Sequence, residues 1–206
     1  RLARADADQR PPDLHLDPPG LDDLIPVPSL PGVCLGKYPV TNTQYRRFVE
    51  ADGYNKSRSW WTKQAIEEIE KYWNGWPTEP RYWDDDRFNH CTQPVVGVSW
   101  HEAMAYCAWL TGVLRSRPLA EGGIGAHEQV TLPSEVEWMA AARSGRPAPK
   151  NQAEEAEDYP WCGPFENWRA NTEEQQETDL KQTSPVHMYP GGATAERVYD
   201  LAGNVW

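Results

Sequence analysis

Four cysteines are the first candidates for chemistry in this sequence, and their spacing argues against a shared metal site. They are Cys34, Cys91, Cys107 and Cys162, and none belongs to a Cys-x-x-Cys pair or matches a zinc signature. Cys107 lies in an apolar run, where a buried thiol packs as a small apolar group. A disulfide framework is disfavoured because the chain is long and shows no secretion signal. We therefore favour free thiols.

Histidine and aspartate offer further candidates for a site. His90 stands beside Cys91, but two neighbouring residues rarely supply two metal ligands in useful geometry. His101 falls at the exposed second position of a predicted helix, so we expect a surface histidine there. Asp84 to Asp86 would act as acid and base only if their surroundings pushed their pKa values apart. Flanking arginines make a solvated turn with local ion pairs the simpler interpretation.

The composition is that of an acidic, ring-rich chain of 206 residues. It has 20 Lys and Arg against 31 Asp and Glu, a net charge of −11, and this balance disfavours nucleic acid and anionic membranes as partners. No apolar run is long enough for a transmembrane helix. The chain has 11 Trp and 9 Tyr but only 3 Phe. Its core should therefore contain rings whose N–H or O–H groups need partners when buried.

The chain divides into an arm and one domain. Residues 1–30 are rich in Pro and Asp and are predicted to form a linker or extended arm. Residues 31–206 are predicted to form the domain, with a Trp-rich insert over 54–92. We expect ring burial, rather than backbone ladders, to hold this irregular insert. Trp60 and Trp61 either pack the insert or line a ligand groove, and packing is the favoured interpretation.

The expected elements are few and short. Helices are predicted over residues 43–51 and 63–72, from Ser99 to about Leu110 with a stop at Thr111-Gly112, and from Ser134 until Gly145. The last two begin with the capping boxes Ser99–Glu102 and Ser134–Glu137. Short strands are expected within 33–40, 94–98 and 130–132. Few helices and much loop indicate an α+β fold.

Helical spacing also predicts which residues face the core. In the helix that begins after Ser99, Trp100, Cys107 and Leu110 recur on one broad face. In the helix that begins after Ser134, Val136 and Ala140 are predicted to face inward.

Six strings, found in a fixed order along the chain, carry a resemblance to a known family. They occupy residues 37–42, 93–100, 131–138, 170–172, 184–186 and 199–206, the last reading Tyr-Asp-Leu-Ala-Gly-Asn-Val-Trp. Through them the chain resembles the formylglycine-generating-enzyme family, also called the sulfatase-modifying-factor domain, over about residues 33–206. The resemblance implies a C-type-lectin-like α+β fold. Such a fold has a small twisted antiparallel sheet, two main helices and much irregular loop, and its C-terminal part is expected to be missing here.

The resemblance also implies a chemistry. Active members oxidise a cysteine of a sulfatase-type substrate to formylglycine, using copper held by two cysteines that lie beyond the Gly-Asn-Val-Trp string. None of the four cysteines here matches that pair, so we expect no catalytic residue in this chain and no activity of the chain alone. Copper is expected only in the full-length parent. The chain is interpreted as a piece of a longer bacterial, cytoplasmic protein, and the missing part of its own domain is an expected partner.

Calcium is the metal that the resemblance places within this chain. Asn171 and Asn204 match the family's calcium positions, Thr172 offers its carbonyl, and Asp179 or Glu177 offers charge. Calcium takes six to eight oxygen ligands of these kinds, often from loops. The alternative is a solvated acidic loop in which asparagines occupy turns.

A non-catalytic role is the alternative function. The same scaffold occurs in ligand-binding variable proteins of retroelements and in modules attached to bacterial signalling domains. The Trp-rich stretch between Tyr54 and Asn89 is similar to inserts in such bacterial relatives. In that case the implied partner is a peptide or protein ligand.

Overall fold

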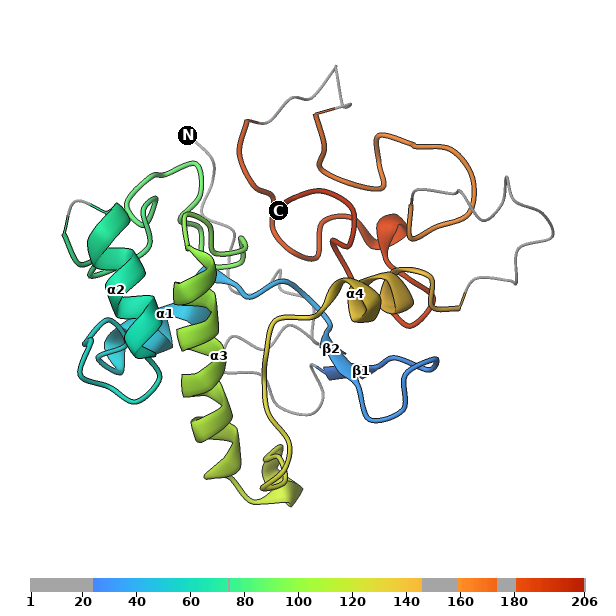
Figure 1. Cartoon of the computed structure of the whole chain (residues 1–206). Helices are drawn as coiled ribbons and strands as arrows, with labels where there is room; N and C mark the ends of the chain where they lie inside the picture. The colour runs from blue at the N-terminus through green and yellow to red at the C-terminus, as the bar shows by residue number, and fades with distance from the viewer. Residues whose placement is uncertain (1–23, 74, 146–158, 174–180, 206) are drawn as a thin grey trace.

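The computed structural model describes residues 24–73, 75–145, 159–173 and 181–205, and it is α+β with little regular structure (Figure 1). Its helices are α1 (Asn42–Glu50), α2 (Lys63–Tyr72), α3 (Trp100–Arg115) and α4 (Glu135–Ala142). Its strands are β1 (Leu24–Pro26) and β2 (Cys34–Gly36), and short 3-10 turns lie at Leu119–Glu121 and Pro190–Gly192. Over these described ranges, no helix combines the length and apolar character needed to span a membrane.

Side-chain caps begin all four described helices. Capping boxes pair Thr41 with Gln44 in α1, Ser99 with Glu102 in α3 and Ser134 with Glu137 in α4. At α2, the hydroxyl of Thr62 accepts from the backbone N–H of Ala65. Each cap satisfies N–H groups that a helix leaves unpaired at its start. The two predicted boxes are therefore confirmed.

The ends of α3 and α4 differ from the predicted ones. The predicted stop of α3 at Thr111-Gly112 is wrong, because the helix continues to Arg115. The hydroxyl of Thr111 donates to the carbonyl of Cys107 at 2.8 Å, and Leu114 extends the buried face by another turn. At the other helix, α4 ends at Ala142, shortly before Gly145, whose φ of 70° cannot continue a helix.

Two residues predicted to face the core are exposed. Trp100 is 63 % exposed and Val136 is 69 % exposed, so both predictions are wrong. Both residues stand in the first turn of their helices, beyond the packed part of each face. Leu110 is buried as predicted, and α4 buries Ala141 instead of Val136.

The described sheet is a single antiparallel pair. β1 pairs with β2, with Ile25 opposite Leu35, so residues within the 1–30 segment are tied to the domain. The strands predicted over 94–98 and 130–132 are not formed. Pro94 makes only an isolated bridge, since proline has no N–H for a ladder. The N–H of Val130 donates to a side chain, the Thr111 hydroxyl, rather than to a strand.

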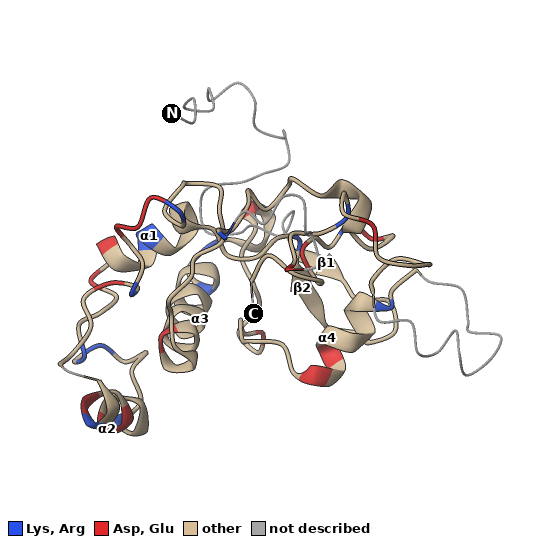
Figure 2. Ribbon diagram, turned by 90° about the horizontal axis from the view of Figure 1, so that it is seen from above, with Lys and Arg blue, Asp and Glu red and all other residues tan. Residues whose placement is uncertain are grey.

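Two hydrophobic clusters divide the described residues. The larger one joins α1, α2, α3 and the Trp-rich insert, and it includes Tyr45, Phe48, Trp61 and Leu110. The smaller one joins α4 to β1, β2 and the C-terminal loops. Figures 1 and 2 both show α1, α2 and α3 grouped on one side and α4 with the strands on the other.

Indole hydrogen bonds hold the Trp-rich insert to the larger cluster. The N–H groups of Trp60 and Trp61 both donate to the carbonyl of Gly53 at 2.8 Å. The N–H of Trp76 donates to the carbonyl of Tyr54 at 2.5 Å. Buried indoles usually find such partners, and here two adjacent carbonyls supply them. Ring burial thus holds this segment, as the sequence predicts.

Gly53 stands where this packing leaves no room for a side chain. A methyl group there would collide with the Phe48 carbonyl oxygen and lie 2.8 Å from its ring. We expect Gly53→Ala to lower the free energy of unfolding by about 1–3 kcal/mol through overpacking. A Cβ on Gly112 of α3 meets nothing within 4 Å, so Gly112→Ala should raise stability by about 0.5–1 kcal/mol. Urea unfolding followed by Trp fluorescence measures both, and equal effects would contradict this account.

Candidate functional site

The structure brings Asn171 and Asn204 into direct contact. The amide oxygen of Asn204 accepts from the side-chain nitrogen of Asn171 at 3.3 Å and from the backbone N–H of Ser184 at 2.8 Å. The Ser184 hydroxyl donates to the same oxygen at 3.2 Å. The amide nitrogen of Asn204 donates back to the Ser184 carbonyl at 3.1 Å. We call this set of bonds the asparagine clasp, and it joins three loops that are distant in sequence.

Backbone conformation explains the residue types of the clasp. Asp200, Gly203 and Asn204 have φ values of 54°, 85° and 67°, a left-handed region that Gly, Asn and Asp adopt most readily. A Cβ on Gly203 would collide with the carbonyl of Asn171. That carbonyl accepts from the backbone N–H of Asn204 at 2.8 Å. The Asp-Leu-Ala-Gly-Asn segment thus turns tightly enough to place Asn204 on Asn171.

Asp200 belongs to this cluster and was not predicted as a site residue. Its carboxyl is mostly buried and accepts from the amide nitrogen of Asn204 at 3.1 Å. Burial raises its pKa from 3.8 to about 7, and the Asn204 hydrogen bond opposes that rise. Its place in the Tyr-Asp-Leu-Ala-Gly-Asn-Val-Trp string was the available signal. The carboxyl is a polar oxygen group held beside the predicted calcium residues.

The side-chain oxygens near the clasp differ in how many hydrogen bonds they receive from the protein. The Asn204 amide oxygen receives three donors and is therefore engaged by the protein. The buried hydroxyl of Thr172 has no hydrogen-bond partner within the described part of the chain. Asp179 and Glu177 lie outside the described residues. Beside the clasp, the Thr172 hydroxyl is thus a polar group that the described part of the chain leaves unsatisfied.

The cysteines are not brought together as a metal centre. All four are free, and Cys107 is the buried one, as predicted. Burial raises the pKa of its thiol to about 11, which suits an inert packing role. Among the described residues, no group of three or more His, Cys, Asp or Glu side chains is placed to hold a metal ion.

His90, His101 and Asp85 each form a pairwise contact rather than a shared site. His101 was predicted on the surface, but its side chain is only 18 % exposed and its Nε2 lies 2.8 Å from a Glu68 oxygen. The prediction fails because α2 of the insert lies beside the start of α3. His90 contacts Thr92, with 3.1 Å between Nδ1 and the hydroxyl. Asp85 pairs with Arg87 at 2.6 Å, and that guanidinium lowers the pKa of Asp85 to about 2. The predicted turn with local ion pairs is confirmed.

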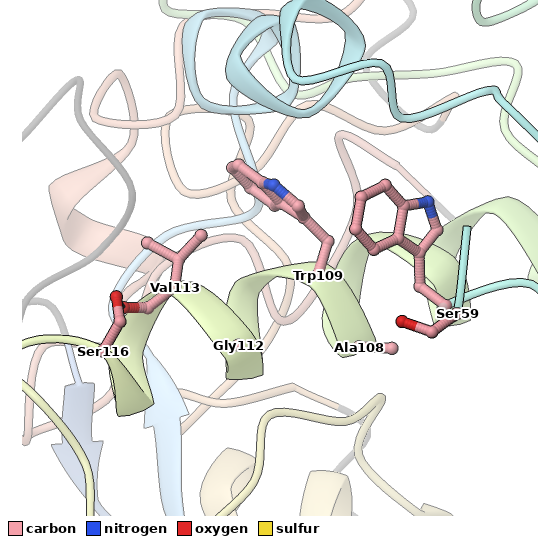
Figure 3. A pocket seen from close by; sticks show the side chains of 7 residues that line it. Ser59, Ala108, Trp109, Gly112, Val113 and Ser116 are labelled. Carbon is pink, nitrogen blue, oxygen red and sulfur yellow. The ribbon is translucent and has the colours of Figure 1, made fainter.

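A groove lies along α3, next to the insert (Figure 3). Its lining residues are Ser59, Trp60, Ala108, Trp109, Gly112, Val113 and Ser116. Trp60 therefore both packs the insert and lines a groove, whereas Trp61 is buried. The groove contains no titratable group, so it offers surface for contact rather than acid, base or nucleophile.

Comparison with known proteins assigns the family. The family model of the sulfatase-modifying factor enzyme 1-like domain matches residues 27–206. The chain therefore belongs to the sulfatase-modifying-factor family, the family of the formylglycine-generating enzyme. The match begins at Val27, just after β1, and runs to the last residue of the chain.

Three relatives show the range of proteins that contain such a sequence. The chain is 30 % identical to hercynine oxygenase from Mycobacterium tuberculosis, covering 92 % of the chain and 40 % of the relative. It is 29 % identical to serine/threonine-protein kinase Pkn1 from Chlamydia trachomatis, covering 91 % and 24 %. It is 28 % identical to the formylglycine-generating enzyme from Thermomonospora curvata, covering 84 % and 57 %. The chain thus spans about two fifths of the hercynine oxygenase that it matches.

The asparagine clasp gives a prediction that separates hydrogen bonds from backbone strain. Asn204→Gly keeps the left-handed backbone but removes the side-chain bonds, so we expect a loss of about 1–3 kcal/mol in stability. Asn204→Ala removes the same bonds and adds strain, about 1–2 kcal/mol more. Thermal unfolding of both variants measures the difference. Wild-type stability of Asn204→Gly would show that the clasp contributes nothing.

Asp200 gives a prediction for pH. Its folded-state pKa lies above the unfolded value, so its contribution to stability is full below about pH 4 and is lost as pH rises through about 7. The loss is about 1.4 kcal/mol for each unit of pKa difference. Between about pH 4 and about pH 7, we expect the stability of Asp200→Asn to fall less than that of wild type. Urea unfolding in the presence of a chelator measures this, and parallel pH profiles would refute it.

Proposed function

We propose that this chain forms the structural scaffold of a C-type-lectin-like domain, and that its full-length parent oxidises a cysteine of a substrate protein to formylglycine. The asparagine clasp carries the proposal. It joins the family strings that contain Asn171, Ser184 and Asn204 into one hydrogen-bonded unit. Such a pre-organised loop cluster is what a site built on irregular structure requires.

Copper does not fit the residues of this chain. The family's metal needs two cysteine thiolates, whereas Cys107 is buried with a raised pKa and the other three cysteines are single exposed thiols. We therefore assign no copper step to these residues. Free exposed thiols are typical of a reducing compartment, which supports a cytoplasmic parent.

The direct test of this proposal is formylglycine formation. We expect the chain alone, supplied with copper and a cysteine-containing peptide, to form no aldehyde, and the full-length parent to form it. Mass spectrometry and capture by a hydrazide probe measure the aldehyde. Aldehyde formation by the chain alone would overturn the assignment of scaffold. An inactive parent would favour the non-catalytic alternative.

Calcium binding at the Asn171–Thr172 side is the second part of the proposal. Asn171 and Thr172 would hold the ion with their oxygens, with Asp179 or Glu177 adding charge and Asn204 holding Asn171 in place. The partnerless buried hydroxyl of Thr172 supports this placement. Bound calcium would supply charge neutralisation and rigidity to the loop cluster. No oxidation chemistry is assigned to it.

Melting with and without calcium tests this site. At 100 times the dissociation constant, calcium should stabilise the chain by about 2.7 kcal/mol relative to chelator. Asn171→Ala should abolish the difference. Asn55→Ala, which changes an exposed asparagine of the insert, should leave the difference unchanged. Identical curves for wild type with calcium and with chelator would refute the site.

A non-catalytic binding module is the alternative function, and the groove on α3 favours it. The groove is lined by Trp60 and Trp109 together with small residues and has no charged member. A peptide or protein ligand with an apolar side chain suits such a lining. A sequence of this kind also occurs within a protein kinase relative.

A further inference from the structure

A buried tyrosine is hydrogen-bonded to a buried carboxylate beneath the insert, away from the asparagine clasp. The hydroxyl of Tyr54 donates to Oε1 of Glu102 at 2.7 Å. The other carboxylate oxygen accepts from the backbone N–H of Ser99 at 2.7 Å, as part of the α3 capping box. Glu102 is fully buried, and the hydroxyls of Tyr45 and Tyr54 are 3.3 Å apart. Tyr54 thus has an ordered proton acceptor inside the core.

Aromatic rings connect this tyrosine to the outside of the insert. The ring centroids of Tyr54 and Trp61 are 6.1 Å apart, and those of Trp61 and Trp76 are 5.0 Å apart. Trp61 is buried, whereas Trp76 is partly exposed. The indole N–H of Trp76 also donates to the Tyr54 carbonyl, which holds the two residues together. The three rings form a continuous path from the core toward solvent.

A phenol loses one electron readily only when its proton can leave at the same time. Tyr54 meets that condition through Glu102. Tyr106 provides the internal comparison, because it is equally buried but its hydroxyl has no hydrogen-bond partner within the described residues. Burial, with the charge of Glu102, raises the pKa of Tyr54 above its ordinary value. The phenol therefore keeps its proton until the ring is oxidised.

We propose that Tyr54 is a redox-active tyrosine that uses Glu102 as its proton acceptor and Trp61 and Trp76 as its electron path. A one-electron oxidant of the metal-polypyridyl or organic-radical class takes an electron from Trp76. Trp61 then gives an electron to Trp76, and Tyr54 gives an electron to Trp61. The phenolic proton of Tyr54 passes at the same time to Oε1 of Glu102. The products are one reduced oxidant, one neutral Tyr54 radical and one protonated Glu102. A soluble thiolate reverses the step by giving one electron to the Tyr54 radical and becoming a thiyl radical, while Glu102 returns the proton to the phenolate oxygen.

Such a residue would store an oxidising equivalent away from the reacting site, which suits a family that includes an oxygenase. The proposal requires no copper and no residue outside this chain. It therefore stands or fails independently of the formylglycine assay.

Flash oxidation of the whole chain tests it. A ruthenium(II) polypyridyl sensitiser with persulfate supplies the oxidant, and electron paramagnetic resonance on frozen samples detects neutral tyrosyl radicals. We expect a long-lived radical in wild type and loss of most of that signal in Tyr54→Phe. Tyr106→Phe is the matched control and should keep the signal, since it removes a buried hydroxyl that has no partner. An unchanged signal in Tyr54→Phe would overturn the proposal.

Circular dichroism shows whether Tyr54→Phe folds. If it does not fold, two measurements that do not use this variant still test the proposal. Radical formation in wild type should slow severalfold in D2O, because a proton moves with the electron. Trp76→Phe should also slow it severalfold, whereas Trp168→Phe, which changes an exposed tryptophan remote from this path in sequence, should not. Equal rates in H2O and D2O, or equal rates in Trp76→Phe and wild type, would refute the path.

Discussion

The carbonyl of Gly53 is the acceptor on which the larger half of the described structure depends. It receives the indole N–H groups of Trp60 and Trp61, and the next carbonyl receives that of Trp76. An unpaired buried N–H is costly, so these bonds allow Trp61 to be buried and Trp60 and Trp76 to pack against the core. They also explain why a long segment with one helix and no ladder stays packed against α1 and α3.

The smaller half is organised by side-chain amides rather than by a sheet. Two short strands cannot order the C-terminal loops. Asn204 does so through hydrogen bonds to Asn171 and to Ser184. The loops that carry the proposed calcium residues are therefore positioned by a few polar contacts, and one substitution can affect all of them together.

Local signals predicted the parts of this protein that depend on neighbouring residues. The capping boxes at Ser99 and Ser134 satisfy helix N–H groups within three residues, so local sequence suffices to place those helix starts. Asn171 and Asn204 stand in family strings, but their mutual contact spans 33 residues of chain and follows from no local pattern. The prediction of a strand at 130–132 was wrong, because the N–H of Val130 donates to a side-chain acceptor on α3. The prediction that His101 lies on the surface was wrong, because its partner, Glu68, belongs to another helix.

Sequence alone determined the family, the α+β class, the helix starts and the residue types of the clasp, because each follows from short-range hydrogen bonding or from ordered motifs. Tertiary structure alone decided which polar groups share a site. It buried the carboxyl of Asp200 and thereby raised its pKa. It also set the Tyr54 hydroxyl on Glu102 across 48 residues of chain. Desolvation and long-range pairing depend on the packed whole, so no local pattern encodes them.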